Sequence, residues 1–360
     1  MPAPRGHAPS MRDVAQRAGV SHQTVSRVVN DSPNIRSDTR ERVLQAIEEL
    51  GYRPNGLARA LAHGRSRRIG LLMESSSHYG PMNMLRGVEI AARRAGYAAT
   101  TFGVTSPDEF EEGIDFLRDQ RVDALAIIAP RAQSLESLAR VTLPPACVLV
   151  GSMPPDAGGS GPIESLPRVG VDQALGARLA VQHLIASGHR TIAHLAGPAD
   201  WFDAQVRRHE WLRTLESAGL EAGPTVEGDW RPQSGYDATE ALLAIPGVTA
   251  VFAANDQMAL GLIHGLSDRG LAIPGDLSVV GFDDIPESAH FRPPLTTVHQ
   301  DFQAVGEAAV DLLLQRLGEA SHGTPQQIVP ELVVRASTAS PGHGPSGAGG
   351  TPAAEAPGVR

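Results

Sequence analysis

Apolar and polar positions recur with helical spacing over the first part of the chain. Residues 11–18 form one amphipathic stretch, and Gly19 and Val20 after it make a tight turn. Ser21 is a suitable N-cap for a second stretch that continues to about residue 30. Two short helices joined by a tight turn predict a helix-turn-helix.

A third helix is expected after the following loop. Ser37 is placed to cap this helix, and Gly51 marks its C-terminal end. Its apolar residues repeat at i, i+4 and i+7, namely Val43, Ile47 and Leu50. The three helices are expected to share one small core, so residues 9–53 are interpreted as a domain. Residues 54–68, with a short helical stretch after Pro54 and the basic sequence RSRR, are interpreted as a linker.

From residue 69 the pattern changes to short apolar runs that alternate with amphipathic stretches, which is typical of parallel strands covered by helices. The predicted strands are residues 69–73, 97–104, 124–129, 147–150, 191–196, 249–254 and 277–282. The predicted helices lie near residues 83–95, 108–120, 174–187, 204–218, 235–244, 257–269 and 302–317. Because the ~260 residues involved exceed one usual sheet, residues 69–336 are expected to form two doubly wound α/β lobes with a cleft between them. Residues 337–360 are rich in Gly, Pro and Ala and are expected to be disordered.

Charge is distributed unevenly along the chain. The net charge is −9, yet residues 1–68 contain 12 Arg and six acidic residues, against 19 Arg and 34 acidic residues in the remainder. A basic end on an acidic protein suggests contact with nucleic acid at that end. Neither a membrane-spanning run nor a signal-like N-terminus is present in the sequence, so a cytoplasmic location without membrane contact is expected. The single cysteine, Cys147, excludes an internal disulfide and lies in an apolar run typical of a buried strand.

The second predicted helix has one apolar and one polar face. Valines at positions 25, 28 and 29 fall on the first face. The polar face carries His22, Gln23, Ser26, Arg27 and Asn30. Gln can pair with adenine and Arg with guanine in the major groove, and hydroxyls near the helix start suit phosphate oxygens. The alternative, an ordinary solvated face, is outweighed by the basic helix-turn-helix context.

Several strings resemble the LacI family of transcription regulators. In the N-terminal domain they are Asp13-Val14-Ala15, AGVS (18–21), TVSRVVN (24–30) and GYRPN (51–55). Further along they are HLIASGHRTIAHLAGP, EGDW, ANDQMALG, LSVVGFDD and PPLTTVHQDF, so the resemblance covers about residues 11–336. It implies an all-α headpiece that binds double-stranded operator DNA, followed by a periplasmic-binding-protein-like core that binds a small effector.

The resemblance implies roles for individual headpiece residues. His22, Gln23 and Arg27 would face bases, while Ser21, Thr24, Ser26 and Asn30 would lie near the DNA backbone or base edges. The segment NGLARALA would fold into a hinge helix on DNA, and it supplies two more candidate DNA-binding residues, Asn55 and Leu61. Leu61 would wedge into the minor groove at the centre of a pseudo-palindrome, which requires a homodimer. A flexible linker whose leucine packs on the core remains the alternative.

Polar residues at the ends of two predicted strands indicate a ligand site. Asn255 and Asp283 follow strands, and ligands of open α/β sheets bind beyond strand C-termini. The resemblance implies that these two residues and Arg207 hold sugar hydroxyls. Asp256 is interpreted instead as the N-cap of the helix at 257–269, and Asp284 likewise as structural.

Aromatic residues and one loop complete the expected effector site. By resemblance Trp230, Phe302 and the adjacent Gln300 line the cleft, where aromatic faces suit the C–H side of a sugar ring, although either aromatic could belong to the core. His78, Tyr79, Gly80 and Pro81 form the first-lobe loop that shapes selectivity in the family. Asp203 and Val150 stand at positions where galactoside-binding members of the family carry different residues that contact the inducer. The implied ligand is therefore a sugar of unspecified identity.

Other classes of protein fit less well. The single G-x-G-x-x-G, at residues 342–347, has no strand before it, and the 13 histidines show no ligand spacing, so neither an enzyme nor a cofactor or metal is expected. A sugar-transport binding protein would carry a secretion signal and no headpiece. The remaining alternative is a regulator of the same family that responds to a purine or another non-sugar metabolite. By resemblance the expected protein is a repressor with a sugar as inducer. Residues 337–360 contain no leucine, so they lack the C-terminal leucine repeat that joins dimers into tetramers elsewhere in the family, and dimers alone are expected.

Overall fold

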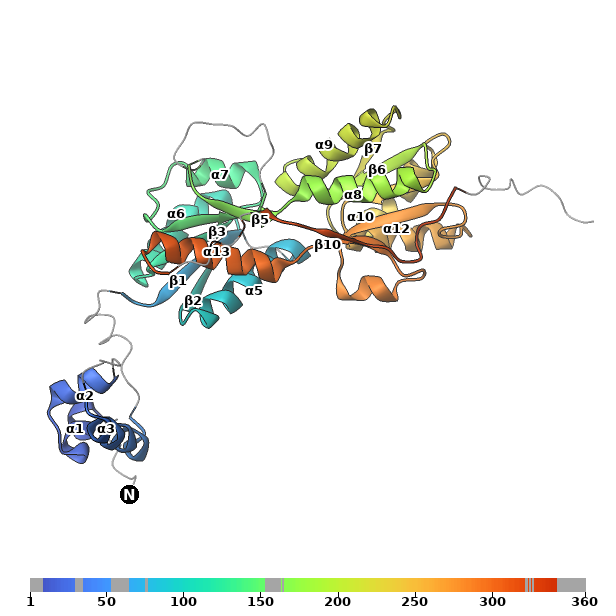
Figure 1. Ribbon diagram of the computed structural model, residues 1–360. Coiled ribbons are helices and arrows are strands. Elements are labelled where there is room, and N and C mark those ends of the chain that lie inside the picture. Colours follow the sequence, from blue (N-terminus) through green and yellow to red (C-terminus); the bar gives the residue numbers. More distant parts are fainter. Residues whose placement is uncertain are drawn as a thin grey trace, which may run out of the picture. The chain divides into compact units, whose positions relative to one another are not determined.

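The computed structural model describes residues 9–29, 35–52, 65–74, 77–152, 163, 165–320, 323, 325 and 327–341. It divides the chain into two compact units, residues 1–67 and 68–360. Figure 1 shows the helices and strands of each unit and labels most of them.

The first unit holds three helices, α1 (Met11–Ala18), α2 (His22–Val29) and α3 (Ser37–Leu50). One valine from each helix is fully buried in their shared core: Val14, Val25 and Val43. Gly19 follows α1 in the left-handed conformation, with φ of 65°, and this turn directs the chain into α2. The predicted helix-turn-helix and the third helix are confirmed.

The helix ends show two correct predictions and one wrong one. Ser21 Oγ accepts a hydrogen bond from the Thr24 N–H at 3.1 Å, which is the predicted N-cap of α2. Ser37, however, is the first residue of α3 rather than its cap. The N-cap position belongs to Arg36, whose side chain makes no capping bond. Gly51 ends α3 in the left-handed conformation, as the sequence predicts.

The second unit contains two six-stranded sheets, one in each lobe. The first sheet has the order β11-β5-β4-β3-β1-β2, and its neighbouring strands pair in parallel. Its strands are β1 (Arg68–Glu74), β2 (Ala98–Val104), β3 (Ala124–Ile128), β4 (Cys147–Val150), β5 (Arg168–Val171) and β11 (Gln327–Ile328). The second sheet has the order β12-β10-β9-β8-β6-β7, and β12 alone runs antiparallel to its neighbour. Its strands are β6 (Ile192–Ala196), β7 (Thr225–Glu227), β8 (Ala250–Ala253), β9 (Ser278–Asp283), β10 (Thr296–His299) and β12 (Glu331–Val333).

Helices cover both faces of each sheet. In the first lobe Leu71 of β1 packs in the cluster with α5 and α13, whereas the next residue, Leu72, packs on the other face with α6. The helices of this lobe are α5 (Tyr79–Arg94), α6 (Phe110–Asp119), α7 (Ala132–Leu138) and α13 (Phe302–Arg316). Those of the second lobe are α8 (Gln173–Ala186), α9 (Phe202–Ser217), α10 (Pro232–Asp237), α11 (Thr239–Leu243) and α12 (Asp256–Asp268). Short 3-10 helices lie at Pro107–Glu109 and Pro286–His290. The predicted two-lobed, doubly wound α/β core is confirmed.

The chain passes between the lobes three times, at residues 171–173, 299–302 and 328–331. The first and third passages are tied together, because the Asp172 N–H donates to the Ile328 carbonyl at 2.9 Å. Side chains tie the first to the second, since Gln173 Nε2 donates to Gln300 Oε1 at 2.7 Å in a buried position. The passages therefore form one bonded unit.

The pattern did not predict the shortest elements. Strands β5, β7, β10, β11 and β12 are two to four residues long, and each contains a polar residue or glycine that interrupts the apolar run. Helix α7 was missed as well, and the helix predicted at 235–244 is divided into α10 and α11 at Ala238.

The predicted boundary of the disordered tail was wrong for residues 337–341. Ser337 is fully buried, its Oγ donates to the Val279 carbonyl at 2.6 Å, and its own carbonyl accepts from the Val279 N–H. These bonds pair the segment with the start of β9. The segment was missed because its small side chains carry no apolar signal. In the described part of the chain, no helix is long and apolar enough to cross a membrane.

Candidate functional sites

The polar face of α2 stands in solvent. His22, Gln23 and Arg27 are exposed, Ser26 is half-buried, and Val25 and Val28 face the core. This is the division that the sequence predicts.

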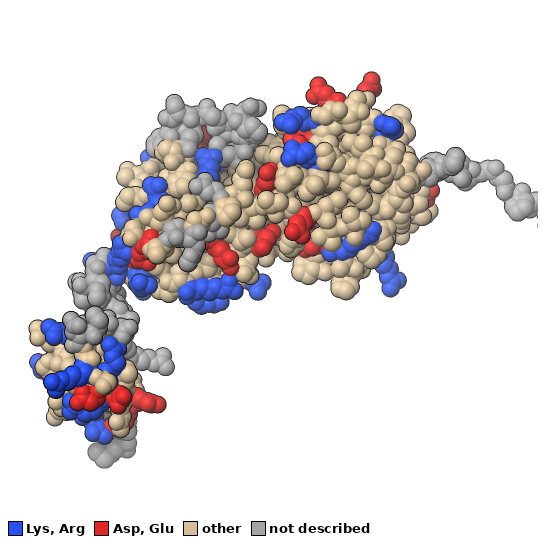
Figure 2. Space-filling view, in the orientation of Figure 1, with Lys and Arg blue, Asp and Glu red and all other residues tan. Residues whose placement is uncertain are grey.

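The start of α2 carries two hydroxyl groups, on Ser21 and Thr24, whose oxygens lie 2.9 Å apart. Arginine side chains lie over the visible face of this unit, with acidic side chains among them (Figure 2). The other candidate DNA-binding residues, Asn30, Asn55 and Leu61, lie outside the described residues.

The second unit has a cavity of about 310 Å³ between its lobes, and most of the predicted effector residues line it. The first lobe contributes His78, Tyr79, Gly80 and Pro81 from the start of α5. The second lobe contributes Trp201, Asp203, Arg207, Trp230, Asn255 and Asp283. Trp201 was not predicted, although its position two residues before Asp203, at the start of α9, is the signal that could have indicated it.

Backbone geometry explains how the second-lobe residues reach the cavity. Asn255 comes just after β8 and Asp283 ends β9, so both lie at the carboxyl edge of the parallel sheet. Trp230 and Asp283 have positive φ angles of 72° and 112°, conformations that non-glycine residues rarely adopt. Such strain is typical of residues whose direction is fixed by their surroundings.

Arg207 is the centre of the site. Its side chain is 3% exposed, Nε donates to Gln173 Oε1 at 2.9 Å, and Nη1 donates to the Ala254 carbonyl. Its Cζ lies 3.8 Å from the centre of the Phe282 ring. Nη2 lies 3.7 Å from Asp203 Oδ2 and 3.9 Å from Asp283 Oδ1, which is too far for hydrogen bonds. This nitrogen is therefore directed between two carboxyl groups with its donors available to a ligand.

Asp283 is buried behind this guanidinium. Burial raises the pKa of its carboxyl to about 7, against the opposing effects of Arg207 and of the hydrogen bond from Gln300. That bond, from Gln300 Nε2 to Asp283 Oδ1, measures 2.6 Å. Near neutral pH the carboxyl can therefore both accept and donate a hydrogen bond.

Asn255 lines the cavity and also takes the capping role that the sequence suggested for Asp256. Asn255 is the N-cap of α12, since its Oδ1 accepts from the Met258 N–H at 2.8 Å, and its Nδ2 donates to the Trp230 carbonyl at 3.0 Å. Asp256, the predicted cap, is instead a buried acceptor for Thr297 Oγ1 at 2.5 Å and for the Ile285 N–H at 2.9 Å. Burial raises the pKa of Asp256 well above its usual value. Its structural interpretation holds, but the capping reason was wrong.

Asp284 is structural, as the sequence interpretation has it. Its carboxyl accepts from Arg335 Nη2 at 2.6 Å and lies 3.0 Å from His299 Nδ1. These contacts join β10 and the segment after β12 to the end of β9.

Two predicted effector residues do not line the cavity. Gln300 bonds Gln173 and Asp283 and so supports the site from behind. Phe302 is 7% exposed and packs edge-on against Tyr79, with ring centres 6.0 Å apart. Both were predicted as ligand contacts, and the structure places them in a supporting layer instead.

Three rings that line the cavity, those of His78, Trp201 and Trp230, are in contact with one another through Trp201. The Trp201 ring meets His78 at 5.2 Å and Trp230 at 5.8 Å, with interplanar angles of 83° and 71°. Trp230 is 4% exposed, and its buried Nε1 has no hydrogen-bond partner among the described residues. A ligand acceptor would satisfy this donor.

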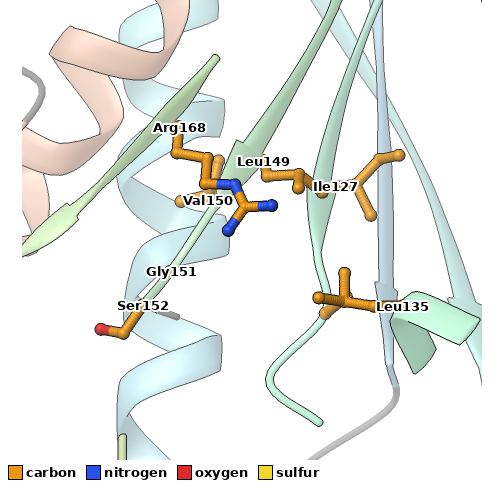
Figure 3. Close-up of a pocket in the computed structure, with 8 residues that line it drawn as sticks. Ile127, Leu135, Leu149, Val150, Gly151, Ser152 and Arg168 are labelled. Carbon is orange, nitrogen blue, oxygen red and sulfur yellow. The ribbon is translucent and has the colours of Figure 1, made fainter. Parts of the chain in front are cut away.

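A second, smaller cavity lies in the first lobe at the ends of β3 and β4, with a volume of about 220 Å³ (Figure 3). Its labelled lining is mostly aliphatic, with Arg168 and Ser152 as the polar members. Val150, which the sequence comparison with the family marked as a departure, lines this cavity and not the one between the lobes.

Comparison with known proteins places both units in one family. Residues 10–55 match the model for bacterial regulatory proteins of the lacI family, and residues 181–338 match a periplasmic binding protein-like domain. The lactose operon repressor of Escherichia coli K12 is 37% identical over 92% of this chain and 91% of its own length. The transcriptional repressor PurR of Haemophilus influenzae (strain ATCC 51907) is 34% identical over 92% of this chain and 99% of its own.

Solved structures agree. The lac repressor dimer bound to operator and the anti-inducer ONPF has a TM-score of 0.78 and 34% identity, and the alignment covers 92% of this chain and all of that one. The CelR–cellobiose complex has a TM-score of 0.66 and 32% identity, over 91% of this chain and 99% of that one. A helix-turn-helix unit followed by a two-lobed binding domain defines a DNA-binding transcriptional repressor. The chain belongs to the LacI family, which confirms the resemblance seen in its sequence.

Proposed function

We propose that the protein is a dimeric repressor that reads a pseudo-palindromic operator through α2 and releases it when a neutral sugar or glycoside binds between the lobes. Three parts of this proposal have separate support: the DNA-reading residues, the dimer and the effector.

The exposure of His22, Gln23 and Arg27 on one face of α2 supports contact with base edges. The hydroxyls of Ser21 and Thr24 at the helix start suit phosphate oxygens, which position the helix without reading sequence. Asn30 and Ser26 complete the proposed reading face. We assign the hinge residues Asn55 and Leu61 to the minor groove at the operator centre, by resemblance to the family.

The dimer is supported by a relative. The similar lac repressor structure is described as a dimer bound to operator, and its likeness to this chain covers both units. Two headpieces on one two-fold axis would read two half-sites, so the operator is expected to be a pseudo-palindrome.

The arrangement around Arg207 carries the effector proposal. Nη2 points between Asp203 and Asp283 at distances that leave room for a ligand oxygen beside each carboxyl group. Neighbouring hydroxyls of a sugar can accept from the guanidinium while they donate to the carboxylates. Trp201 and Trp230 supply apolar ring surface for the C–H groups of the same sugar.

A purine or another non-sugar metabolite is the second candidate, because relatives named PurR stand beside the lactose repressor in similarity. A purine base has no pair of neighbouring hydroxyl groups. Arg207 Nη2, with Asp203 and Asp283 on either side of it, presents a donor and two acceptors that match such a pair. We therefore favour the sugar.

Because the cavity takes residues from both lobes, an effector would bind best to one particular arrangement of them. If the effector and the operator favour different arrangements of the lobes, binding at one site weakens binding at the other. We propose that the effector favours the DNA-free arrangement and is therefore an inducer.

Two measurements on the full chain test this function. Selection from a pool of random DNA duplexes should yield a pseudo-palindrome, and the Arg27→Ala variant should lose that preference. A thermal-shift screen with lactose, cellobiose, other mono- and disaccharides and purine bases should show a rise with a sugar, since a ligand at 100 times its Kd adds about 2.7 kcal/mol of stability. The sugar that raises the melting temperature should then weaken operator binding. A response to purines alone would replace the sugar proposal with the second candidate.

A further inference from the structure

The lobes touch at a place separate from the three chain passages. Here Pro130 and Arg131, just after β3 in the first lobe, meet Asp200, Trp201 and Phe202 at the start of α9 in the second. The Phe202 N–H donates to the Pro130 carbonyl at 3.0 Å, and Arg131 and Trp201 form an isolated antiparallel bridge. Arg131 Nη1 also lies 3.6 Å from Asp200 Oδ2. We call these five residues the clasp.

The first-lobe side of the clasp is anchored by a buried carboxylate of the same lobe. Arg131 Nη2 bonds Oε1 of Glu74, a carboxylate at the end of β1 that is 5% exposed. The other oxygen of Glu74 accepts from Ser134 Oγ at 2.6 Å, in the first turn of α7. One guanidinium therefore joins a buried anchor in the first lobe to an exposed carboxylate in the second.

The second-lobe side of the clasp is part of the effector cavity. Trp201 lies in the clasp through its backbone and lines the cavity through its ring, which contacts His78 and Trp230. Helix α9 starts at the next residue and carries Asp203 and Arg207. The clasp therefore fixes the point from which three cavity residues extend.

The lining of the cavity shows where the clasp stands relative to a ligand. The cavity takes residues from both lobes, so a ligand in it would lie between them. The clasp joins the two lobes beside this cavity, through Trp201 and through the bond between Phe202 and Pro130. Separation of the lobes at this place would break that bond.

We propose that the clasp is a latch that holds the lobes closed over the effector. Arg131 is its positioning residue: it does not line the cavity, and it acts through Asp200 and Trp201 on how long the effector stays bound. The location of the effector rests on the proposed function, whereas closure of the latch is a property of the protein without ligand.

The Phe202 amide allows closure to be measured without an effector. It is the first amide of α9, and a first-turn amide has no partner within its own helix. Hydrogen exchange at Phe202 therefore reports the bond to Pro130. The Asp200→Asn variant removes the ion pair at an exposed side chain and should raise this exchange rate about twofold to fivefold. The double variant Glu74→Gln/Arg131→Gln, which removes the anchor without burying a lone charge, should raise it further.

The matched control is Glu240→Gln. It removes another exposed ion pair of the second lobe, with Arg269 at 3.4 Å, away from the cavity lining. This variant should leave Phe202 exchange at the wild-type rate. Urea unfolding midpoints should fall by a similar small amount in Asp200→Asn and Glu240→Gln, since each loses one exposed ion pair. A rise in Phe202 exchange in Asp200→Asn alone therefore separates latching from general stability. Wild-type exchange at Phe202 in both Asp200→Asn and the double variant would overturn the latch.

The second arm uses lactose, cellobiose and adenine as probes, with dissociation followed by tryptophan fluorescence. Any probe that binds should leave Asp200→Asn about twofold to fivefold faster than the wild type, and should leave Glu240→Gln at the wild-type rate. An unchanged dissociation rate in Asp200→Asn would refute the action of the latch on the ligand. If none of the probes binds, that result counts against the proposed effector classes, and Phe202 exchange still decides whether the clasp latches the lobes.

Discussion

In α2 the side chains proposed to meet DNA stand in solvent, whereas in the effector cavity the side chains proposed to meet the ligand are already bonded to one another. Arg27 is exposed, while Arg207 is 3% exposed and donates to Gln173 and to the Ala254 carbonyl. The reading helix can therefore change without disturbing the fold. Residues of the cavity hold the second lobe together, so changes there affect both ligand binding and stability.

The Arg207→Met substitution should show the largest effect. It removes two hydrogen bonds and the cation beside Asp283, and leaves Gln173 and the Ala254 carbonyl without their donor. We expect a loss of about 3 kcal/mol in the free energy of unfolding, by urea titration, together with at least about 100-fold weaker effector binding by calorimetry. The neighbouring, exposed Arg208 gives the control Arg208→Met, which should change neither quantity. Normal stability in Arg207→Met would contradict the expectation that cavity residues also stabilise the second lobe.

The Asp283→Asn substitution tests the same buried network through pH. The pKa of Asp283 is raised from 3.8 to about 7, so the folded state binds the proton more tightly than the unfolded state. Its contribution to stability is fully present below pH 3.8 and is lost as the pH rises through 7. Between pH 5 and pH 8 the wild type should lose about 2 to 3 kcal/mol more than Asp283→Asn, which has no carboxyl to ionise.

Urea unfolding at the two pH values measures this difference. The amide can still accept the hydrogen bond from Gln300, so the variant should fold. Parallel pH profiles for wild type and variant would show that burial does not raise the pKa of Asp283.

The same contrast explains what the sequence could predict. In the headpiece, caps and valine spacing are local signals, so α1 and α2 and the exposed face of α2 follow from the sequence. In the core, strand ends point to Asn255 and Asp283, but their partners come from distant parts of the chain. The Arg207–Gln173 bond joins two separate helices, and no local pattern contains it.

Misplaced residues have the same cause. The resemblance assigned Gln300 and Phe302 to the cavity lining, yet they support the cavity from behind. The direction of their side chains depends on how the second passage and α13 pack, which the sequence does not show. Trp201 was not predicted as a cavity residue. Its backbone bridge to Arg131 of the other lobe is a tertiary contact that no local pattern contains. Ser337 was assigned to the tail because a small polar residue gives no sign in the sequence that its backbone pairs with Val279.

The Arg27→Ala substitution should affect binding alone. Because the side chain is exposed on α2, the free energy of unfolding should stay within about 0.5 kcal/mol of the wild type. Operator binding should weaken by about 1 to 3 kcal/mol, with relaxed base preference, measured by fluorescence anisotropy on the selected duplex and on single-base variants. Arg42→Ala, at an exposed position of α3, controls for the loss of one charge and should keep the preference for the selected sequence. Undiminished discrimination in Arg27→Ala would remove this residue from the reading face.

The smallest effect is expected at the first-lobe edge of the cavity, where His78 and Tyr79 are only half-buried. His78 packs edge-on against Trp201 with ring centres 5.2 Å apart, and burial lowers the pKa of its imidazole, so the neutral ring contributes packing rather than charge near pH 7. The His78→Ala substitution should weaken effector binding by about 1 kcal/mol, or about fivefold, with stability unchanged. The control His209→Ala removes an exposed histidine of α9 and should leave binding at the wild-type level. A loss as large as that of Arg207→Met would mean that the first lobe holds the effector as strongly as the second. The contrast between the hydrogen-bonded residues of the second lobe and the half-buried residues of the first would then fail.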